Sequence, residues 1–364
     1  MNRLPILHQN LAGLALLALL SLPALAATQE SRPAPIALAI HGGAGTLLRA
    51  EMSAEQEQQY RAVLGQALDA GYAVLKSGGA SLDAVQATIL VMEDSPLFNA
   101  GKGAVFTSDG KHELDAAVMT GHDLRAGSVA GITQVKNPIL AARAVMEQSE
   151  HVMLTGPGAD TFARTQGLAM VDNHYFDTEF RWQQLLKLRG EPLDTPMPGS
   201  KSANAAAPAW RAEGRKFGTV GAVALDQAGH LAAGTSTGGM TNKRWGRVGD
   251  APVIGAGTYA NAECAVSATG HGEFFIRVGV AHEICARIRF KGESPAAAAR
   301  YVVQDTLKPM QAEGGVIVLG RDGRFALEFN SPGMYRGVID VHGKREIAIF
   351  GTDDDATPLT GASH

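Results

Sequence analysis

Two strand-like segments joined by a short turn, within residues 217–237, constrain the fold more than any other stretch of the chain. Valine, threonine and alanine nearly alternate over residues 217–226, with glycines where another backbone or a ligand must come close. Residues 227–230 predict a turn, and a second strand follows to Thr237. In an antiparallel hairpin with this turn at its centre, Thr219 lies opposite Thr237, with their Cβ atoms roughly 5 Å apart. The sequence therefore predicts a hairpin that brings two hydroxyl groups within hydrogen-bonding reach.

A long polar segment precedes this hairpin. Residues 190–218 are rich in proline, alanine and small polar residues, a composition typical of a flexible linker. Thr219 directly follows Gly218, the last residue of this segment, and it stands at the first position of a strand that is apolar enough to be buried. This arrangement makes Thr219 a candidate for the new N-terminus of a chain that is cut before it. An ordinary linker between domains is the alternative interpretation.

Six motifs recur in order along most of the chain. They are His41–Gly45, Leu97–Gly103, Gly218–Val223, Ser236–Met240, Gly246–Asp250 and Ser267–Glu273. Together they resemble the plant-type L-asparaginase/isoaspartyl peptidase family, whose members are N-terminal-nucleophile (Ntn) hydrolases. Because the resemblance covers nearly the whole chain after its first residues, it is far more specific than any single motif.

The resemblance implies an α+β fold, the four-layer αββα sandwich of Ntn hydrolases, in which helices cover two stacked sheets. Helix and strand periodicity alone predict only α+β or α/β. The resemblance also implies that the chain is cut between Gly218 and Thr219. Residues 27–218 would then form an α subunit, and residues 219–364 a β subunit that begins with the nucleophile. Family members pair two such units, so an (αβ)2 assembly is expected.

Apolar periodicity and capping residues predict the individual elements. Residues 35–40 predict a strand that ends in a tight, glycine-rich turn at His41–Gly45, on the wall of the site. A turn of this kind could also cradle a phosphate, but it has neither a Gly-Lys-Ser/Thr sequence nor a third glycine that opens a helix. Helices are expected over residues 55–76, 81–92 and 272–290, and a hairpin over residues 314–330.

The first 26 residues have the form of a secretory signal. Arg3 supplies the positive charge, residues 11–22 are apolar, and Ala24-Leu25-Ala26 is a small-x-small cleavage site. The apolar run is shorter than the roughly 20 residues that span a membrane, which argues against the alternative of a transmembrane anchor. We therefore expect an exported protein without membrane attachment after removal of the signal, and a periplasmic one if the source is a Gram-negative bacterium.

The formal net charge does not indicate binding to nucleic acid or to an anionic membrane. The whole chain has 32 Lys and Arg against 36 Asp and Glu, a net charge of -4. Removal of residues 1–26 takes away Arg3 and no acid, so 31 cations against 36 acids leave a charge of -5. This mild acidity does not favour a nucleic-acid partner.

The chain has two cysteines, Cys264 and Cys285, too few for a disulfide framework. Export would permit one bridge between them, but Cys285 lies in a helical pattern, and we expect two free, buried thiols. His112 and His151 could be metal ligands, yet no cluster of His, Cys and Asp in the sequence has the spacing of a metal site. Both histidines are expected at strand ends or on the surface.

The residue types around Thr219 permit amide hydrolysis. A threonine hydroxyl is a weak nucleophile until a base takes its proton, and an N-terminal threonine has its own α-amine, with a pKa near ~8, for that purpose. The resemblance implies that Thr237 hydrogen-bonds the Thr219 hydroxyl and the attacking water. It further implies that the Thr269 hydroxyl and the Gly270 N–H form an oxyanion hole, in which one donor lowers the barrier by roughly 3 kcal/mol.

Arg247 and Asp250 are the expected specificity pair. An arginine binds a substrate α-carboxylate in a fork, and an aspartate binds an α-ammonium group, so the two together select an L-aspartyl unit. A surface ion pair worth about 0–1 kcal/mol is the alternative interpretation. The resemblance adds Gly270, Gly272 and Asn99 to the substrate-binding residues.

The resemblance also implies a sodium ion held by backbone carbonyl groups, those of Met92, Glu93, Ser95, Phe98, Ala100 and Lys102. Carbonyl ligands leave no signature in residue type, so the sequence alone predicts an ordinary turn around Pro96. No organic cofactor is expected.

The expected function is that of a self-cleaving threonine hydrolase. It would cleave the side-chain amide of L-asparagine and of β-aspartyl (isoaspartyl) dipeptides, and it would release L-aspartate. Two alternatives remain open, an amidase of the glycosylasparaginase type and an exported aspartate-binding protein without turnover.

Overall fold

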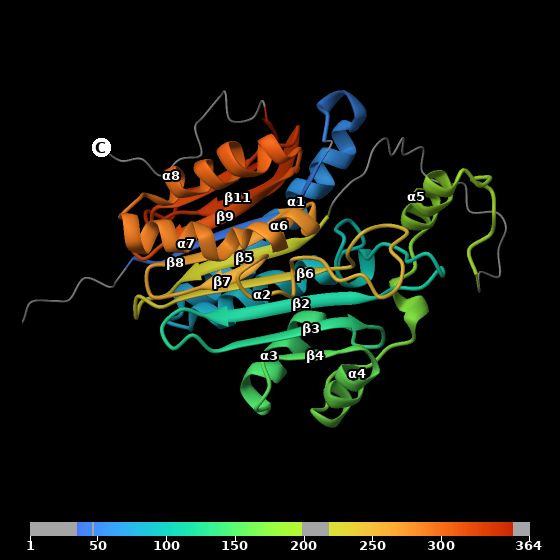
Figure 1. Cartoon of the computed structure of the whole chain (residues 1–364), viewed down its shortest axis with the longest axis horizontal. Coiled ribbons are helices and arrows are strands. Elements are labelled where there is room, and N and C mark those ends of the chain that lie inside the picture. The colour runs from blue at the N-terminus through green and yellow to red at the C-terminus, as the bar shows by residue number, and fades with distance from the viewer. Residues whose placement is uncertain (1–34, 46, 199–217, 352–364) are drawn as a thin grey trace, which may run out of the picture. The chain divides into compact units, whose positions relative to one another are not determined.

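The strands of the chain form two sheets. The computed structural model describes residues 35–45, 47–198 and 218–351, and within these ranges an eight-stranded and a four-stranded sheet are present (Figure 1). In spatial order, the larger sheet consists of β12 (Arg345–Phe350), β11 (Gly333–Ile339), β1 (Ala37–Gly45), β5 (Val220–Leu225), β6 (Leu231–Thr237), β2 (Leu114–Thr120), β3 (Ala126–Ile132) and β4 (Met153–Thr155). The smaller sheet consists of β10 (Phe325–Phe329), β9 (Gly314–Gly320), β8 (Cys264–Gly270) and β7 (Thr258–Ala260).

Helices cover the outer face of each sheet. The α-helices of the described chain are α1 (Ala54–Lys76), α2 (Ser81–Glu93), α3 (Pro138–Gln148), α4 (Gly156–Thr165), α5 (Glu179–Arg189), α6 (Gly272–Val278), α7 (Val280–Lys291) and α8 (Pro295–Arg300). Helices α1 to α3 contact strands of the larger sheet, and α7 and α8 contact strands of the smaller one (Figure 1). The sheets contact each other through β5, β6 and β8, and through β1 and β9. The layers run helix, sheet, sheet, helix, so the expected αββα sandwich is confirmed.

Alternation along the strands assigns each side chain to one side of its sheet. In β1, Leu38 and Ile40 belong to the apolar core under α1 and α2, whereas Ala37 and Ala39 belong to the core between the two sheets. A third apolar core lies between the smaller sheet and the helices α7 and α8. Odd-numbered positions of β5, β6 and the first half of β1 therefore face the space between the sheets, and this is the face that carries the candidate site.

The hairpin of β5 and β6 has the predicted register. Val220 pairs with Ser236, so the next pair outward is Thr219 and Thr237. The turn closes through a hydrogen bond from the Gly229 N–H to the Asp226 carbonyl, at 2.9 Å. The hairpin of β9 and β10 and the helices α1 and α2 also lie where the sequence pattern predicts them.

Two element predictions are wrong. The glycine-rich segment after Ile40 is not a turn but the second half of β1, because β11 pairs with it to Gly45, with an irregularity between His41 and Gly43. The single helix expected over residues 272–290 is divided into α6 and α7 at Gly279. The φ of Gly279 is 65°, a left-handed conformation that ends an α-helix and favours glycine.

The two cysteines form a disulfide bond, which corrects the expectation of free thiols. Cys264 lies on β8 and Cys285 on α7, and the packing of this helix on that strand brings their Cα atoms to 5.5 Å. That separation lies within the range that a disulfide requires. Both residues are buried, as expected. The helical pattern predicted the burial of Cys285 but not which strand it faces.

Removing this bridge is expected to destabilise the folded chain. The cysteines are 21 residues apart, and a crosslink over such a loop reduces the entropy of the unfolded chain by an amount worth roughly 3 kcal/mol. We expect the double variant Cys264→Ala, Cys285→Ala to have a free energy of unfolding about 2–4 kcal/mol lower, measured by denaturant titration. Two reactive thiols in the denatured, unreduced wild-type protein would contradict the bridge.

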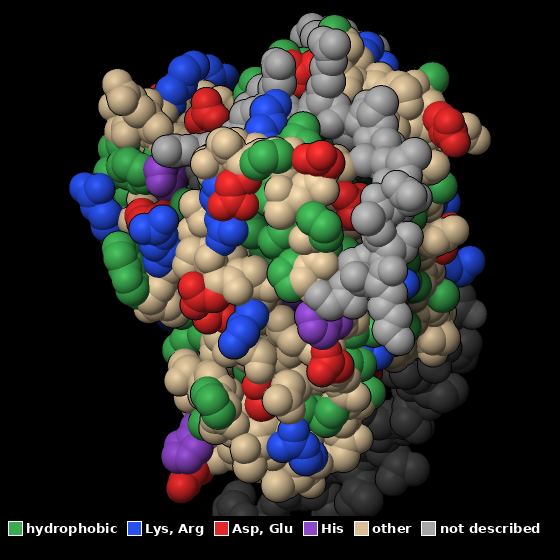
Figure 2. Space-filling model, turned by 90° about the vertical axis from the view of Figure 1, so that its right-hand side faces the viewer, with side chains coloured by type: hydrophobic (Ala, Val, Ile, Leu, Met, Phe, Trp, Pro, Cys, Tyr) green, Lys and Arg blue, Asp and Glu red, His purple; other side chains and the backbone are tan. Residues whose placement is uncertain are grey.

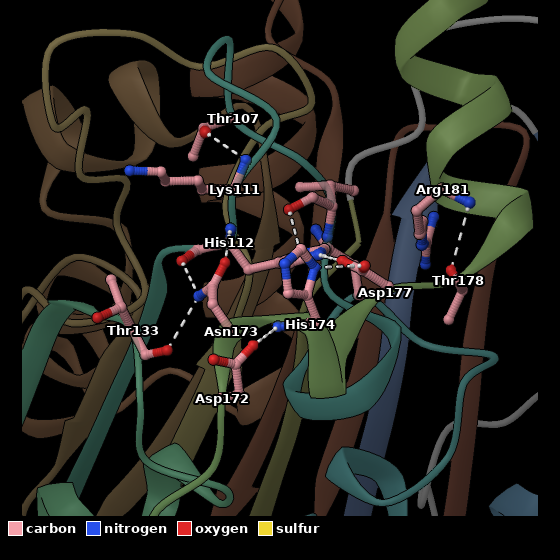
Figure 3. A network of polar contacts seen from close by, with 12 residues as sticks. Thr107, Lys111, His112, Thr133, Asp172, Asn173, His174, Asp177, Thr178 and Arg181 are labelled. Carbon is pink, nitrogen blue, oxygen red and sulfur yellow. Dashed lines mark hydrogen bonds and ion pairs between the residues drawn. The ribbon is translucent and has the colours of Figure 1, made fainter. Parts of the chain in front are cut away.

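His112 is buried two residues before β2, so it lies at a strand end, one of the two expected places, and not on the surface. Its ring nitrogens lie 3.1 Å from the Val105 carbonyl and 3.0 Å from the Asp177 carboxylate, and Asn173 donates to its backbone carbonyl (Figure 3). The network ties the segment before β2 to the segment before α5. His151 is exposed, as expected. Among the described residues, no group of three or more His, Cys, Asp or Glu could hold a metal ion.

Two predictions fall on residues outside the described ranges, the secretory signal at residues 1–26 and most of the linker, residues 199–217. Within the described part of the chain, no helix is long and apolar enough to cross a membrane. On the face shown in Figure 2, basic and acidic side chains are interspersed among hydrophobic ones, without an extended patch of one sign.

Candidate active site

The candidate site lies at the open end of the β5–β6 hairpin, between the two sheets. Thr219 directly precedes β5, Thr237 ends β6, and Thr269 lies near the end of β8. All three threonines are buried. A recess at this place is lined by Gly218, Thr219, Thr237, Gly239, Met240, Arg247, Gly249, Asp250 and Gly270. The structure therefore brings together most of the site residues expected from the sequence.

Three donors surround the carbonyl oxygen of Gly218. The Thr219 hydroxyl lies 2.8 Å from this oxygen, the Thr237 hydroxyl 3.0 Å and the Asn99 Nδ2 2.7 Å. The two threonine hydroxyl oxygens are 3.1 Å apart. In this continuous chain, the Thr219 hydroxyl thus lies beside the peptide bond that precedes it. Negative charge that developed on the Gly218 oxygen would be stabilised by donors already in place.

Asn99 is held in position from both sides of its amide. Its Oδ1 accepts a hydrogen bond from the Val105 N–H at 2.9 Å, which fixes Nδ2 as the end that donates. Nδ2 donates to the Gly218 and Gly239 carbonyls, each at 2.7 Å. Asn99 therefore orients the residue before Thr219 and the loop after Thr237.

Thr269 and Gly270 lie at the end of β8. The Thr269 hydroxyl oxygen accepts a hydrogen bond from the Ala44 N–H at 3.3 Å, so this side chain connects β8 to the glycine-rich end of β1. Gly270 lines the same recess as Thr219. Thr269 is fully buried and is not among the described residues that line this recess.

Arg247 forms a bidentate ion pair with Glu273, a partner that sequence reasoning missed. Its Nε and Nη2 each donate to one Glu273 oxygen at 2.9 Å, which lowers the pKa of Glu273. Its Nη1 makes no hydrogen bond within the described residues. A methyl group on Gly272 would lie 2.8 Å from Arg247 Nη2 and 2.9 Å from Asp250 Oδ1, so Gly272 lies close to both.

Asp250 is a buried carboxyl group. Burial raises the pKa of Asp250 to about 7, although the nearby Arg247 charge opposes this shift. Its Oδ2 is buried and has no hydrogen-bond partner within the described chain. A buried carboxylate oxygen without a donor would be stabilised by a cationic group of a ligand, because such a group would replace the lost hydration.

A chain of buried, hydrogen-bonded polar side chains contacts the backbone carbonyl of Thr219, and sequence reasoning missed it. The His41 Nδ1 lies 3.0 Å from the Thr219 carbonyl, and its Nε2 lies 2.8 Å from the Ser267 hydroxyl. The Thr235 hydroxyl lies 2.7 Å from Ser267, and the Thr258 hydroxyl donates to Thr235 at 2.6 Å. Burial lowers the pKa of His41 to about 3, so the ring is neutral and orients rather than titrates.

Gly221 makes room for this chain. A methyl group on Gly221 would lie 2.0 Å from the Ser267 hydroxyl oxygen and 2.3 Å from His41 Nε2. Strand alternation could have indicated His41 and Ser267 as residues that face the space between the sheets. It could not have shown that they meet, because they lie on strands of different sheets.

Asp115 is a second buried carboxyl group near the site. It pairs with Thr237 across β2 and β6, and adjacent positions of this kind point to the same side of the sheet. Burial raises the pKa of Asp115, whereas the charge of Lys243 opposes the shift. Lys243 is itself buried and donates to the Glu113 carbonyl at 2.9 Å.

The loop after α2 presents free carbonyl groups. Among the described residues, no donor is bound to the carbonyl oxygens of Glu93, Ser95, Phe98 and Lys102, whereas those of Met92 and Ala100 accept N–H groups of the loop. The loop is tight, since a methyl group on Gly103 would meet the Phe98 oxygen at 2.1 Å. Carbonyl oxygens without donors suit a hard cation, so four of the six expected ligands have a free oxygen that could bind one.

Comparison with known protein families identifies the family of this chain. A sequence model of the asparaginase family matches residues 34–349, which is most of the chain. The chain belongs to this asparaginase family. The resemblance drawn from the six motifs is thereby confirmed.

Curated members of the asparaginase family are similar to this chain over most of their length. The isoaspartyl peptidase of Salmonella typhimurium is 49% identical over 310 residues, which cover 82% of this chain and 93% of that protein. The isoaspartyl peptidase of Escherichia coli is 49% identical over 310 residues, which cover 82% and 91%. A probable isoaspartyl peptidase/L-asparaginase of Arabidopsis thaliana is 41% identical over 325 residues, which cover 86% and 98%. The asparaginase family to which the chain belongs is thus a family of hydrolases.

Proposed function

We propose that the chain cuts itself between Gly218 and Thr219 and then hydrolyses the side-chain amide of L-asparagine and of β-aspartyl dipeptides. The observation that carries this proposal is the position of the Thr219 hydroxyl, 2.8 Å from the oxygen of the preceding carbonyl. That oxygen is within reach of two further donors, Thr237 and Asn99. The names of the relatives support the substrate class.

In the proposed self-cleavage, the Thr219 hydroxyl oxygen bonds to the Gly218 carbonyl carbon. The bond from that carbon to the Thr219 nitrogen then breaks, and the hydroxyl proton passes to this nitrogen, so an ester joins the two residues. Water hydrolyses the ester, which leaves a carboxylate on Gly218 and restores the Thr219 hydroxyl. The product is an N-terminal threonine with a free α-amine.

In the proposed hydrolysis, this amine takes the proton of the Thr219 hydroxyl, since its reference pKa of ~8 suits a base at neutral pH. The hydroxyl oxygen attacks the side-chain amide carbon, and the Thr269 hydroxyl and the Gly270 N–H stabilise the oxyanion. The protonated amine gives its proton to the leaving nitrogen. A water molecule oriented by Thr237 then hydrolyses the ester and releases L-aspartate.

Arg247 and Asp250 are proposed to select the aspartyl unit. Asp250 Oδ2, buried and without a donor, would accept the substrate α-ammonium group. Arg247 would bind the α-carboxylate while Glu273 holds the plane of its guanidinium group. Gly270, Gly272 and Asn99 complete the proposed binding residues, and Asn99 is proposed to act chiefly by positioning Gly218.

The substrate assay that tests the proposal compares β-Asp-Leu, L-asparagine and a glycosyl-asparagine with the purified full-length gene product. We expect L-aspartate to be released from the first two. Release from the glycosyl-asparagine alone would favour a glycosylasparaginase-type amidase. Tight binding of aspartate by a protein that stays a single band on denaturing electrophoresis, without turnover, would favour a binding protein.

We further propose that the protein is exported, that it forms an (αβ)2 assembly and that it binds a sodium ion. Export rests on the signal-like sequence of residues 1–26. The (αβ)2 assembly rests on membership of the family. The sodium ion rests on the free carbonyl groups of the loop after α2, where it would hold the turn that carries Asn99.

The pKa of Asp250 predicts how activity depends on pH. Asp250 binds an ammonium group only as a carboxylate, and its raised pKa of about 7 keeps it protonated below neutrality. We therefore expect kcat/KM for L-asparagine to fall at least about tenfold per pH unit as the pH drops below about 7, with the Thr219 amine steepening this limb. His41 remains neutral over this pH range and does not contribute to the pH profile of kcat/KM.

A pH profile from about pH 5 to pH 9 checks this prediction. The pH profile of the residual activity of Asp250→Asn should lack the fall caused by protonation of Asp250 and should keep the fall caused by protonation of the Thr219 amine. A wild-type profile that stays flat from about pH 5 to pH 8 would exclude Asp250 as the group that binds the ammonium ion.

A further inference from the structure

A second, larger recess has Gly218 in its wall. Its empty volume is about 750 Å³, open solvent included, and its lining includes Tyr60, Phe98, Arg181, Gly218 and Tyr335. The recess that holds Thr219, Arg247 and Asp250 also has Gly218 in its wall. Gly218 therefore borders both recesses in the continuous chain, and cutting the chain after Gly218 removes the bond that holds this residue there.

Arg181 is a buried cation in the wall of this recess. It is 6% exposed, its Nε donates to the Gly103 carbonyl at 2.7 Å, and its Nη1 donates to Gln184 Oε1 at 2.9 Å. Its Nη2 makes no hydrogen bond to the described residues, and no carboxylate of these residues lies within ion-pair distance. Arg287, which is about as exposed, is paired with Glu293 at 2.7 Å.

A buried guanidinium group without a counter-ion is costly, and burial accordingly lowers the pKa of Arg181. A carboxylate that entered the recess would supply the missing charge and accept from Nη2. The position of Arg181 is fixed at the start of α5, where its backbone N–H donates to the capping Thr178 hydroxyl (Figure 3).

Aromatic rings form one part of the wall, and the rest includes the glycine-rich end of β1, Leu47, Met52 and the exposed Glu51. Tyr60 and Tyr335 stack with their ring centroids 4.3 Å apart, and Phe98 packs edge-on against both rings. Burial raises the pKa of both tyrosines, so they stay neutral and add no negative charge beside Arg181. The recess thus offers one buried cationic donor beside an aromatic surface, with the only acidic side chain of the described lining, Glu51, at an exposed position.

We propose that this recess binds the leaving amino acid of a β-aspartyl dipeptide, with Arg181 opposite its α-carboxylate and the aromatic wall against its side chain. The inference rests on the proposed function, in which the aspartyl half occupies the recess of Arg247 and Asp250. The leaving half must then extend away from that recess past the scissile carbonyl, and the second recess is adjacent because the two share Gly218 in their walls. L-Asparagine releases only ammonia and makes no use of this recess.

The test compares three substrates of the wild-type enzyme, namely β-Asp-Leu, β-Asp-Leu amide and L-asparagine. The amide lacks the carboxylate but keeps the scissile bond. We expect its kcat/KM to be at least about tenfold lower than that of β-Asp-Leu, because it loses a charge-assisted hydrogen bond. This comparison needs no variant and so does not depend on the folding of one.

Arg181→Gln should lower kcat/KM for β-Asp-Leu at least about tenfold and remove the difference between acid and amide, while L-asparagine changes less than about twofold. Arg189→Gln, on the same helix but outside the recess, is the matched control and should leave all three values unchanged. Equal rates for acid and amide in the wild-type enzyme, or an equal loss on all substrates in Arg181→Gln, would overturn the inference. Failure of the wild-type enzyme to hydrolyse any of them would overturn the proposed function and the inference together.

Discussion

Replacing Thr219 with alanine is expected to leave the chain in one piece and to abolish hydrolysis. Thr219 supplies the hydroxyl that lies 2.8 Å from the Gly218 oxygen, and its amine becomes free only when the bond before it breaks. Alanine keeps the backbone but has no oxygen to attack the carbonyl. We expect kcat to fall by on the order of a million-fold, the effect of losing a nucleophile in other hydrolases. Denaturing electrophoresis and an aspartate-release assay measure the two losses.

Thr219→Ser is the matched control for this prediction. Serine retains a hydroxyl and, after cleavage, an α-amine, so it should still be cut and should retain activity at a reduced level. If Thr219→Ala hydrolysed L-asparagine at a rate near that of the wild type, another residue would have to be the nucleophile.

Replacing Arg247 with glutamine is expected to have the second largest effect, on substrate binding rather than on self-cleavage. The side chain would lose its charge and the planar fork that suits a carboxylate, and Glu273 would lose its partner. We expect kcat/KM for L-asparagine to fall on the order of 100-fold to 1,000-fold, as when one partner of a desolvated ion pair is removed. Steady-state kinetics over a wide range of substrate concentrations measure this loss.

Self-cleavage distinguishes a binding role of Arg247 from a role in folding. No hydrogen bond connects Arg247 to the Gly218 carbonyl, so Arg247→Gln should still give two bands on denaturing electrophoresis. Arg244→Gln removes an exposed arginine of the same loop and should leave both cleavage and kinetics unchanged. Equal kinetics for Arg247→Gln and Arg244→Gln would exclude the proposed role.

The sequence predicted the site best where local rules determine geometry. A short turn and the two-residue period of a strand together fix the register of a hairpin, so the facing of Thr219 and Thr237 followed from the pattern alone. The order of the six motifs was sufficient to recognise the family. Asn99 was expected near Thr219 only by resemblance, and the structure places its amide against Gly218.

Contacts between distant elements could not be predicted in the same way. The disulfide depends on which turn of α7 faces which residue of β8, and helical periodicity gives only the buried side of a helix. The link from His41 to Ser267 joins strands of two different sheets. The partner of Arg247 is Glu273, from the start of α6, and no spacing rule connects a loop arginine to a carboxylate 26 residues later.

The mass of the active wild-type protein tests the central claim most directly. Purified enzyme that hydrolyses β-Asp-Leu should give two polypeptides under denaturing conditions, and N-terminal sequencing of the smaller one should begin Thr219-Val220-Gly221. A fully active preparation that consists of a single polypeptide containing the intact bond between Gly218 and Thr219 would contradict the claim.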